Sequence, residues 1–194
     1  GVQTCALPIY RVVSEIEKII NSSKIFQTIE RKLTKSVIRR CTIEDSEAFL
    51  IARNSEEVRQ MSTNPEHTIS WPEHLSWWMN TKTEKYVFTD KNNVQEVFFW
   101  IKEWKIDKNG YITAGWFPAN KNTPFTSILK ILDWQIKYYS KKLPGYLWVA
   151  TVKESNKAAI EFNRRLGFVD ATDKSLKVLS IIFPGTTNEF KVLE

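Results

Sequence analysis

The feature that most constrains the fold is a run of short β-strand patterns in the middle of the chain. Three segments rich in β-branched and aromatic residues follow one another, at 86–88, 97–104 and 111–117. Turn-forming residues separate them at 90–93 and 107–110. Short turns join antiparallel neighbours, so this part of the sequence predicts a three-stranded antiparallel meander.

Helices are predicted before the meander. A strand at 36–41 precedes a helix that begins after Thr42 and runs to about Asn54, and a second short helix covers 56–61. A third helix follows Ser70. Thr42 and Ser70 are N-cap residues, since their side-chain oxygens can accept a hydrogen bond from a free backbone N–H.

The pattern after the meander alternates helix and strand. We predict a helix from 123, a buried strand at 146–151, a helix at 156–166 closed by Gly167, and a final hairpin of strands 178–183 and 189–193. The helix from 123 then serves as the crossover to the strand at 146. The order predicts an α/β fold with a mixed, largely antiparallel central sheet flanked by helices.

Length and composition indicate one domain. The chain has 194 residues, of which 42% are hydrophobic and 26% charged, which is enough apolar surface for a core. We expect a single domain at 36–194 and a helical N-terminal appendage at 11–35. Residues 1–10 lack a basic start and are interpreted as non-native sequence rather than a signal peptide.

Several function classes are disfavoured by what the sequence lacks. Its six glycines are widely separated, and neither G-x-G-x-x-G nor G-x-x-x-x-G-K-[ST] occurs. Two cysteines and two histidines predict no metal site and a reduced, cytoplasmic protein. No apolar stretch is long enough for a membrane-spanning helix. The net charge of +6 permits an anionic partner but does not identify one.

Two motifs resemble a known family. The stretch TVKESNKAAIEFNRRLGF at 151–168 is similar to the C-terminal motif of the GCN5-related N-acetyltransferases, with a helix that starts at Asn156 and ends at Gly167-Phe168. The patterns ARN-x-x-x-VR-x-M and IS-x-x-EH-x-x-W, between 51 and 78, resemble members that acetylate amino-sugar nucleotides or protein N-termini. The resemblance implies the acyl-CoA N-acyltransferase fold over 36–194.

The resemblance also implies a cofactor and site residues. Acetyl-CoA would lie where strands 111–117 and 146–151 separate, and a backbone N–H would polarise its thioester. The implied cofactor-binding residues are Phe117, Lys121, Thr123, Phe125, Thr126, Ser127, Thr151 and Asn156. The implied acceptor-binding residues are Arg53, Asn54, Arg59 and Trp78, and the candidates for general base are Glu73 and His74. No metal is implied.

The sequence departs from the family at two places. Thr123 and Phe125 stand where the family's phosphate-binding loop has glycines, which let the backbone approach a phosphate closely. Asn163 stands at the step of the family's proton-donating Tyr, and an amide is not an acid near pH 7. Structural roles remain open for the other candidates: Glu73 as a capping residue, His74 as a packed aromatic, and Arg53 as an ion-pair residue.

Three hypotheses of function follow. The first is an acetyl-CoA-dependent N-acetyltransferase whose partner is a small-molecule or peptide amine, with an amino-sugar nucleotide before a protein N-terminus. The second is a non-catalytic binding or assembly module of the same fold. The third, which rests on the charge of +6 and eight Trp, is a nucleic-acid-associated or nucleobase-acylating protein. The sequence leaves the oligomeric state open.

Overall fold

The computed structural model describes residues 36–62, 64–172, 176, 180–182 and 190–193. The strands are β1 (Val37–Arg40), β2 (Glu84–Thr89), β3 (Gln95–Ile106), β4 (Asn109–Pro118), β5 (Leu147–Lys153) and β6 (Phe190–Leu193). The helices are the 3-10 helix η2 (Ile43–Asp45), α3 (Ser46–Arg53), α4 (Glu56–Arg59), α5 (Trp71–Asn80), α6 (Phe125–Lys142) and α7 (Lys157–Arg165). The predictions for 1–10 and for an appendage at 11–35 lie outside the described residues.

The helix starts follow from local capping. The Ser70 hydroxyl accepts a hydrogen bond from the Glu73 amide at 3.4 Å, and the Asn156 side chain accepts one from the Ala159 amide at 3.1 Å. Each cap satisfies one of the N–H groups that the first helical turn leaves unpaired. Gly167 follows α7 with a φ of 98°, a left-handed conformation that strains most other residues.

The sheet confirms the predicted mixed α/β fold. Its strand order is β1-β2-β3-β4-β5-β6. The meander pairs β2, β3 and β4 antiparallel, β1 and β6 also pair antiparallel with their neighbours, and β4 and β5 pair in parallel. Helix α6 makes the crossover between these two parallel strands, as the sequence predicts.

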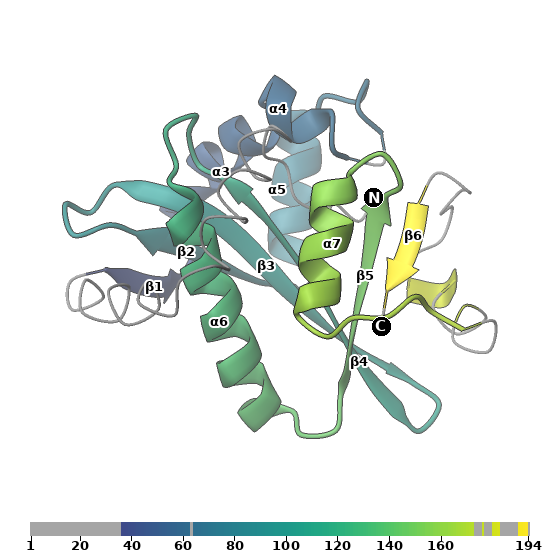
Figure 1. The fold of residues 1–194 in the computed structure, drawn as a ribbon. Coiled ribbons are helices and arrows are strands. Elements are labelled where there is room, and N and C mark those ends of the chain that lie inside the picture. Colours follow the sequence, from purple (N-terminus) through teal and green to yellow (C-terminus); the bar gives the residue numbers. More distant parts are fainter. Residues whose placement is uncertain (1–35, 63, 173–175, 177–179, 183–189, 194) are drawn as a thin grey trace.

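Two apolar layers hold the helices on opposite faces of the sheet (Figure 1). On one face, α3, α4 and α5 pack on β2, β3 and β4 through a cluster centred on Phe49, which is fully buried. On the other face, α6 packs through Ile128, Ile131 and Tyr139, which are also fully buried. The alternation of side chains along each strand supplies both layers from the same segments.

One predicted strand is wrong. The sequence suggested a strand at 178–183, but the described residues 180–182 are helical. Ile182 is buried against Tyr111 and Val149, so the described residues 180–182 pack against the sheet as a helical turn and do not extend it. A short apolar run does not distinguish a strand from a buried helical turn. The strand predicted at 189–193 does form, as β6, and it pairs with β5. The predicted turn at 184–185 lies outside the described residues.

Candidate functional site

The two parallel strands separate soon after they pair. Their register joins Tyr111 to Leu147, Ile112 to Trp148 and Thr113 to Val149. Strand β4 then continues to Pro118 and β5 to Lys153 with no further pairing between them. The facing edges of both strands therefore offer backbone N–H and C=O groups that the sheet does not use. This is the separation that the family resemblance implies.

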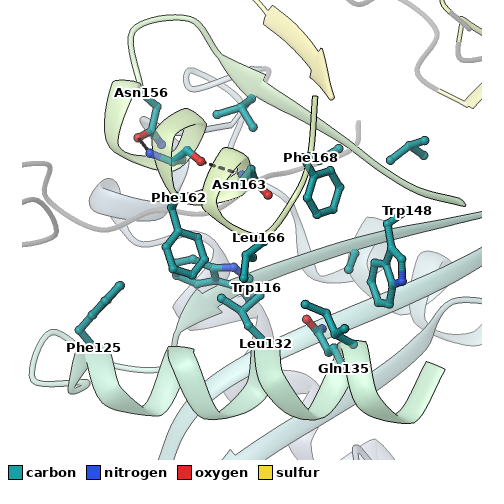
Figure 2. A pocket seen from close by; sticks show the side chains of 16 residues that line it. Trp116, Phe125, Leu132, Gln135, Trp148, Asn156, Phe162, Asn163, Leu166 and Phe168 are labelled. Atoms are coloured by element: carbon teal, nitrogen blue, oxygen red, sulfur yellow. Dashed lines mark hydrogen bonds between the residues drawn. The ribbon is translucent and has the colours of Figure 1, made fainter. Parts of the chain in front are cut away.

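A pocket lies at this opening, between α6 and α7 (Figure 2). It encloses about 890 Å³, which includes space open to solvent. Its walls are mostly aromatic and aliphatic. They come from β4, β5, α6, α7 and the residues that follow α7, with Trp116 from β4, Trp148 from β5, Phe125 and Leu132 from α6, Phe162 from α7, and Leu166 and Phe168 after α7. Apolar walls with few polar groups are typical of small-molecule sites.

Two amide side chains face the pocket from its helical walls (Figure 2). Gln135 on α6 is only 1% exposed, and its Nε2 makes no hydrogen bond to any described residue. Asn163 on α7 donates through Nδ2 to the Ala159 carbonyl at 2.8 Å, which leaves its carbonyl oxygen as the group available to a ligand. A buried amide without a partner costs about 1–3 kcal/mol. A ligand that carries an amide or carbonyl would remove that cost.

The loop before α6 is fastened to β3. The Thr123 hydroxyl donates to the Glu96 carbonyl at 2.6 Å, the Ala119 amide donates to the same carbonyl at 2.8 Å, and the Ser127 hydroxyl donates to the Glu96 carboxylate. The hydroxyls of Thr123 and Ser127, both predicted to bind phosphate, are thus engaged within the protein. Thr126 is exposed on the first turn of α6.

The other predicted cofactor residues occupy varied positions. Lys121 is 83% exposed and lies 3.3 Å from Glu57. Phe125 lines the pocket and its ring packs against Phe162. The Phe117 side chain points away, into the cluster around Phe49 on the opposite face. Thr151 is buried on β5, so Phe117 and Thr151 can serve a ligand chiefly through their backbone.

Three of the predicted acceptor residues have structural contacts. Asn54 forms two hydrogen bonds with the backbone of Ile69, at 2.8 and 3.0 Å, which ties the end of α3 to the segment before α5. Arg59 donates to the Pro65 carbonyl at 2.7 Å and pairs with Glu56. Trp78 is buried in the core cluster.

Arg53 differs from these residues because it has no hydrogen bond or ion pair with any described residue. Burial lowers the pKa of its guanidinium to about 10, and the charge of Glu73 opposes the effect only in part. The group is still charged at neutral pH. A half-buried cation with no ion-pair partner among the described residues is a place where an anionic ligand group would gain stabilisation.

The two candidates for general base lie on α5. His74 is 2% exposed among aromatic rings that include Phe49 and Trp78, and its Nε2 has no described partner. Burial and the nearby positive charges of Arg53 and Lys85 lower its pKa, so it is neutral at pH 7. Glu73 lies at the surface, where its carboxylate is 3.0 Å from His67. Neither residue lines the pocket, which lies on the other face of the sheet.

Sequence reasoning missed Gln135 and Glu96. Gln135 follows Ile131 by four residues and precedes Tyr139 by four, so helical spacing places it on the buried face of α6. A polar residue on the apolar face of a predicted helix is the sequence pattern that could have drawn attention to Gln135. Glu96 gave no comparable signal, because its contacts are with residues that lie more than 20 positions along the chain.

Comparison with known proteins identifies the fold. No protein-family model matches the sequence, and no curated protein matches it either. Among solved structures, spermidine N-acetyltransferase from Vibrio cholerae, in complex with CoA and spermine, is similar at a TM-score of 0.59 and 12% identity over 72% of this chain and 83% of that one. The GNAT domain of S. lividans PAT is similar at 0.56 and 10% identity over 81% and 88%. An aminoglycoside N(6')acetyltransferase from Legionella pneumophila gives 0.53 and 12% over 71% and 81%.

The chain has the GCN5-related N-acetyltransferase fold. At these identities the likeness concerns the fold, and the choice between the amino-sugar branch and others does not follow from it. Within the described part of the chain, no helix combines the length and apolar character needed to cross a membrane. The same residues contain no group of three or more His, Cys, Asp or Glu placed to hold a metal ion.

Proposed function

We propose that this chain is an N-acetyltransferase that transfers an acetyl group from acetyl-CoA to a primary amine. The observation that carries the proposal is the opening between β4 and β5, with a pocket beside it formed by α6 and α7. A structural neighbour with this fold was crystallised with CoA and spermine, which supports a thioester donor and an amine acceptor.

The pocket suits the pantetheine arm of the donor. Free backbone groups of β4 beyond Thr113 can pair with amides of the arm, and one free N–H can stabilise the oxyanion that forms when the amine attacks. The Gln135 amide offers a further hydrogen bond inside an otherwise apolar wall. When bound, acetyl-CoA would supply the activated thioester.

The pocket residues provide neither a clear general base nor a clear acid for proton transfer. The amine must be neutral to attack, and Glu73 and His74 remain the predicted bases. An amide is not an acid near pH 7, and Asn163 Nδ2 donates to the Ala159 carbonyl, so Asn163 supplies no proton to a leaving thiolate. We therefore propose that the thiolate is released without an acid from α7.

Arg53 favours an acceptor that carries an anionic group. Its guanidinium has no ion-pair partner among the described residues, and together with the Lys85 ammonium it places two positive charges near His74. A phosphate or carboxylate would pair with it, whereas a polyamine would be repelled. The preferred acceptor is therefore an amino-sugar nucleotide, and the second choice is a protein N-terminus.

Isothermal titration with acetyl-CoA tests the proposal directly. We expect saturable binding, and absence of binding at millimolar acetyl-CoA would refute the function. Acceptor choice is then read from acetylation of an amino-sugar nucleotide, a peptide with a free N-terminus, and spermidine. Arg53→Gln should raise the KM for the anionic acceptor about tenfold or more, while the matched change Arg165→Gln on the exposed face of α7 should not.

A second candidate is a non-catalytic binding module of the same fold. Two observations favour it: the Asn163 amide is turned back to its own helix, and the Thr123 hydroxyl is engaged with Glu96. The triple variant Thr123→Gly, Phe125→Gly and Asn163→Tyr restores the family pattern. Acetyl-CoA binding that occurs only in this variant would establish the module, and equal binding by the natural chain would exclude that interpretation.

A further inference from the structure

We propose that the Glu96 carboxylate weakens binding of the diphosphate of acetyl-CoA at the N-terminus of α6. Most of the binding free energy of the donor would then come from its pantetheine arm. This inference rests on the proposed function. It concerns a residue outside both motifs, at the start of β3. Its basis is what Glu96 does to the first turn of α6.

Glu96 accepts three hydrogen bonds, two from the loop between β4 and α6 and one from the first turn of α6. Its carbonyl accepts from the Ala119 amide and the Thr123 hydroxyl, and its carboxylate accepts from the Ser127 hydroxyl. Ser127 is 2% exposed, so this contact is inside the protein. The carboxylate is thereby fixed beside the helix N-terminus from which a diphosphate would be gripped.

The electrostatic consequence is a loss of attraction for anions. A helix N-terminus carries roughly half a positive charge, and a carboxylate beside it compensates that charge. The bound donor would add a second anionic group at the same place. The cation of residues 118–127 is Lys121, which extends into solvent and pairs with Glu57. Nothing described on this loop offsets the Glu96 charge.

The loop backbone is also less available than a glycine-rich one. The backbone N–H of Asn122 donates to Asn120 Oδ1 at 2.9 Å and that of Thr123 donates to the Asn120 carbonyl at 3.2 Å, while the Asn120 side chain donates through Nδ2 to the Gln95 carbonyl at 3.1 Å. Pro124 has no N–H to donate. These contacts commit polar groups of the loop to β3 and to the loop itself.

The pocket between α6 and α7 offsets this weaker binding of the diphosphate. The pocket offers aromatic walls and the unpartnered Gln135 amide to an arm that contains amides and a thioester. Binding free energy would therefore come from the pantetheine arm rather than from the diphosphate. A donor that lacks the diphosphate should lose little.

The test compares two ligands on three proteins by isothermal titration. The ligands are acetyl-CoA and acetyl-pantetheine, which has no diphosphate or nucleotide. The proteins are the natural chain, Glu96→Gln and Glu103→Gln. Glutamine keeps an acceptor for the Ser127 hydroxyl and removes the charge. Glu103 lies on the same strand, bonds Lys142 and is partly exposed, so its replacement changes net charge equally.

We expect Glu96→Gln to bind acetyl-CoA about 3- to 10-fold more tightly, with no change for acetyl-pantetheine. The gain should shrink as salt rises, because it is electrostatic. Glu103→Gln should change neither ligand. Ser127→Ala, which releases the carboxylate but keeps its charge, should give less gain than Glu96→Gln.

The inference is overturned if Glu96→Gln brings no gain for acetyl-CoA, or the same gain for both ligands. It is also overturned if Glu103→Gln brings an equal gain, since net charge alone would then explain the effect. Failure of the natural chain to bind either ligand at millimolar concentration would instead refute the proposed function. Thermal unfolding of each variant confirms that it is folded during the titration.

Discussion

The sharpest prediction concerns Glu84, which anchors the C-terminal end of α6 to β2. Its carboxylate accepts hydrogen bonds from Lys142 at 2.6 Å, Tyr139 at 2.9 Å, Arg40 at 2.7 Å and the Tyr86 hydroxyl. Tyr139 is fully buried. Replacing Glu84 by Gln keeps the shape but removes the charge that these donors share.

The pKa of Glu84 gives the size of the stabilisation that its charge provides. Burial alone would raise it, but the hydrogen bonds from Lys142, Tyr86 and Tyr139 outweigh burial and lower it from 4.5 to about 2. That difference corresponds to about 3 kcal/mol of stability. The side chain is 20% exposed, so solvent screening reduces the expected loss to about 2 kcal/mol. Because the pKa is lowered on folding, this stability is present above pH 4.5 and is lost as the pH falls toward 2.

Urea denaturation followed by tryptophan fluorescence measures the effect. Trp134 packs on Tyr86 and Tyr139 and reports on this region. At pH 7, Glu84→Gln should lower the free energy of unfolding by about 2 kcal/mol, and the difference should vanish near pH 2. Glu103→Gln also loses a bond to Lys142 but should cost less than about 0.5 kcal/mol, since Glu103 is 37% exposed. A loss below 0.5 kcal/mol for Glu84→Gln, or equal losses for both variants, would contradict the reasoning.

Three further predictions concern other parts of the molecule. Burial lowers the pKa of His74, so the neutral imidazole stabilises the fold fully above pH 6.5. Below pH 6.5 the free energy of unfolding should decrease by at most about 1.4 kcal/mol per pH unit. Urea midpoints of the natural chain and of His74→Gln from pH 8 to 5 test this, and an equal pH dependence in both proteins would contradict it. Asn54→Ala should lower the free energy of unfolding by about 1–2 kcal/mol at pH 7, because it leaves the half-buried end of α3 without its two hydrogen bonds to Ile69. A urea midpoint unchanged from the natural chain would show that this contact contributes nothing. Ala114→Phe fills the pocket and should weaken acetyl-CoA binding at least tenfold in titration without loss of the fold by circular dichroism; unchanged affinity would place the donor elsewhere.

Local patterns in the sequence predicted most of the secondary structure correctly. The turn residues at 90–93 and 107–110 correctly predicted the meander, and the caps Ser70 and Asn156 form at the predicted helix starts. These features depend on neighbours within a few residues. The run at 178–183 failed for the opposite reason: its described part is helical because Ile182 packs against β4 and β5, which are distant in sequence.

The candidate site was only partly accessible from sequence. The family resemblance predicted the separation of β4 and β5 and drew attention to Asn156 and Asn163, both of which line the pocket. It could not show that Thr123 and Ser127 are turned toward Glu96, since that contact bridges β3 and α6. Nor could it distinguish Arg59, which has close partners, from Arg53, which has none among the described residues.

By itself the sequence determined the order of helices and strands apart from the run at 178–183, the caps at Ser70 and Asn156, and the mixed sheet, while the family resemblance implied the place where the sheet opens. Those follow from periodicity, turn chemistry and a contiguous motif, which act over short stretches of chain. Only the tertiary structure decided which polar side chains are free to meet a ligand. Hydrogen bonds between separate segments engage Thr123, Ser127 and Asn54, and nearby residues engage Arg59. Among the described residues, Gln135 Nε2 and the Arg53 guanidinium have no such partner. Whether a donor or acceptor is satisfied depends on what the fold brings within about 3 Å of it, which short-range patterns in a sequence do not specify.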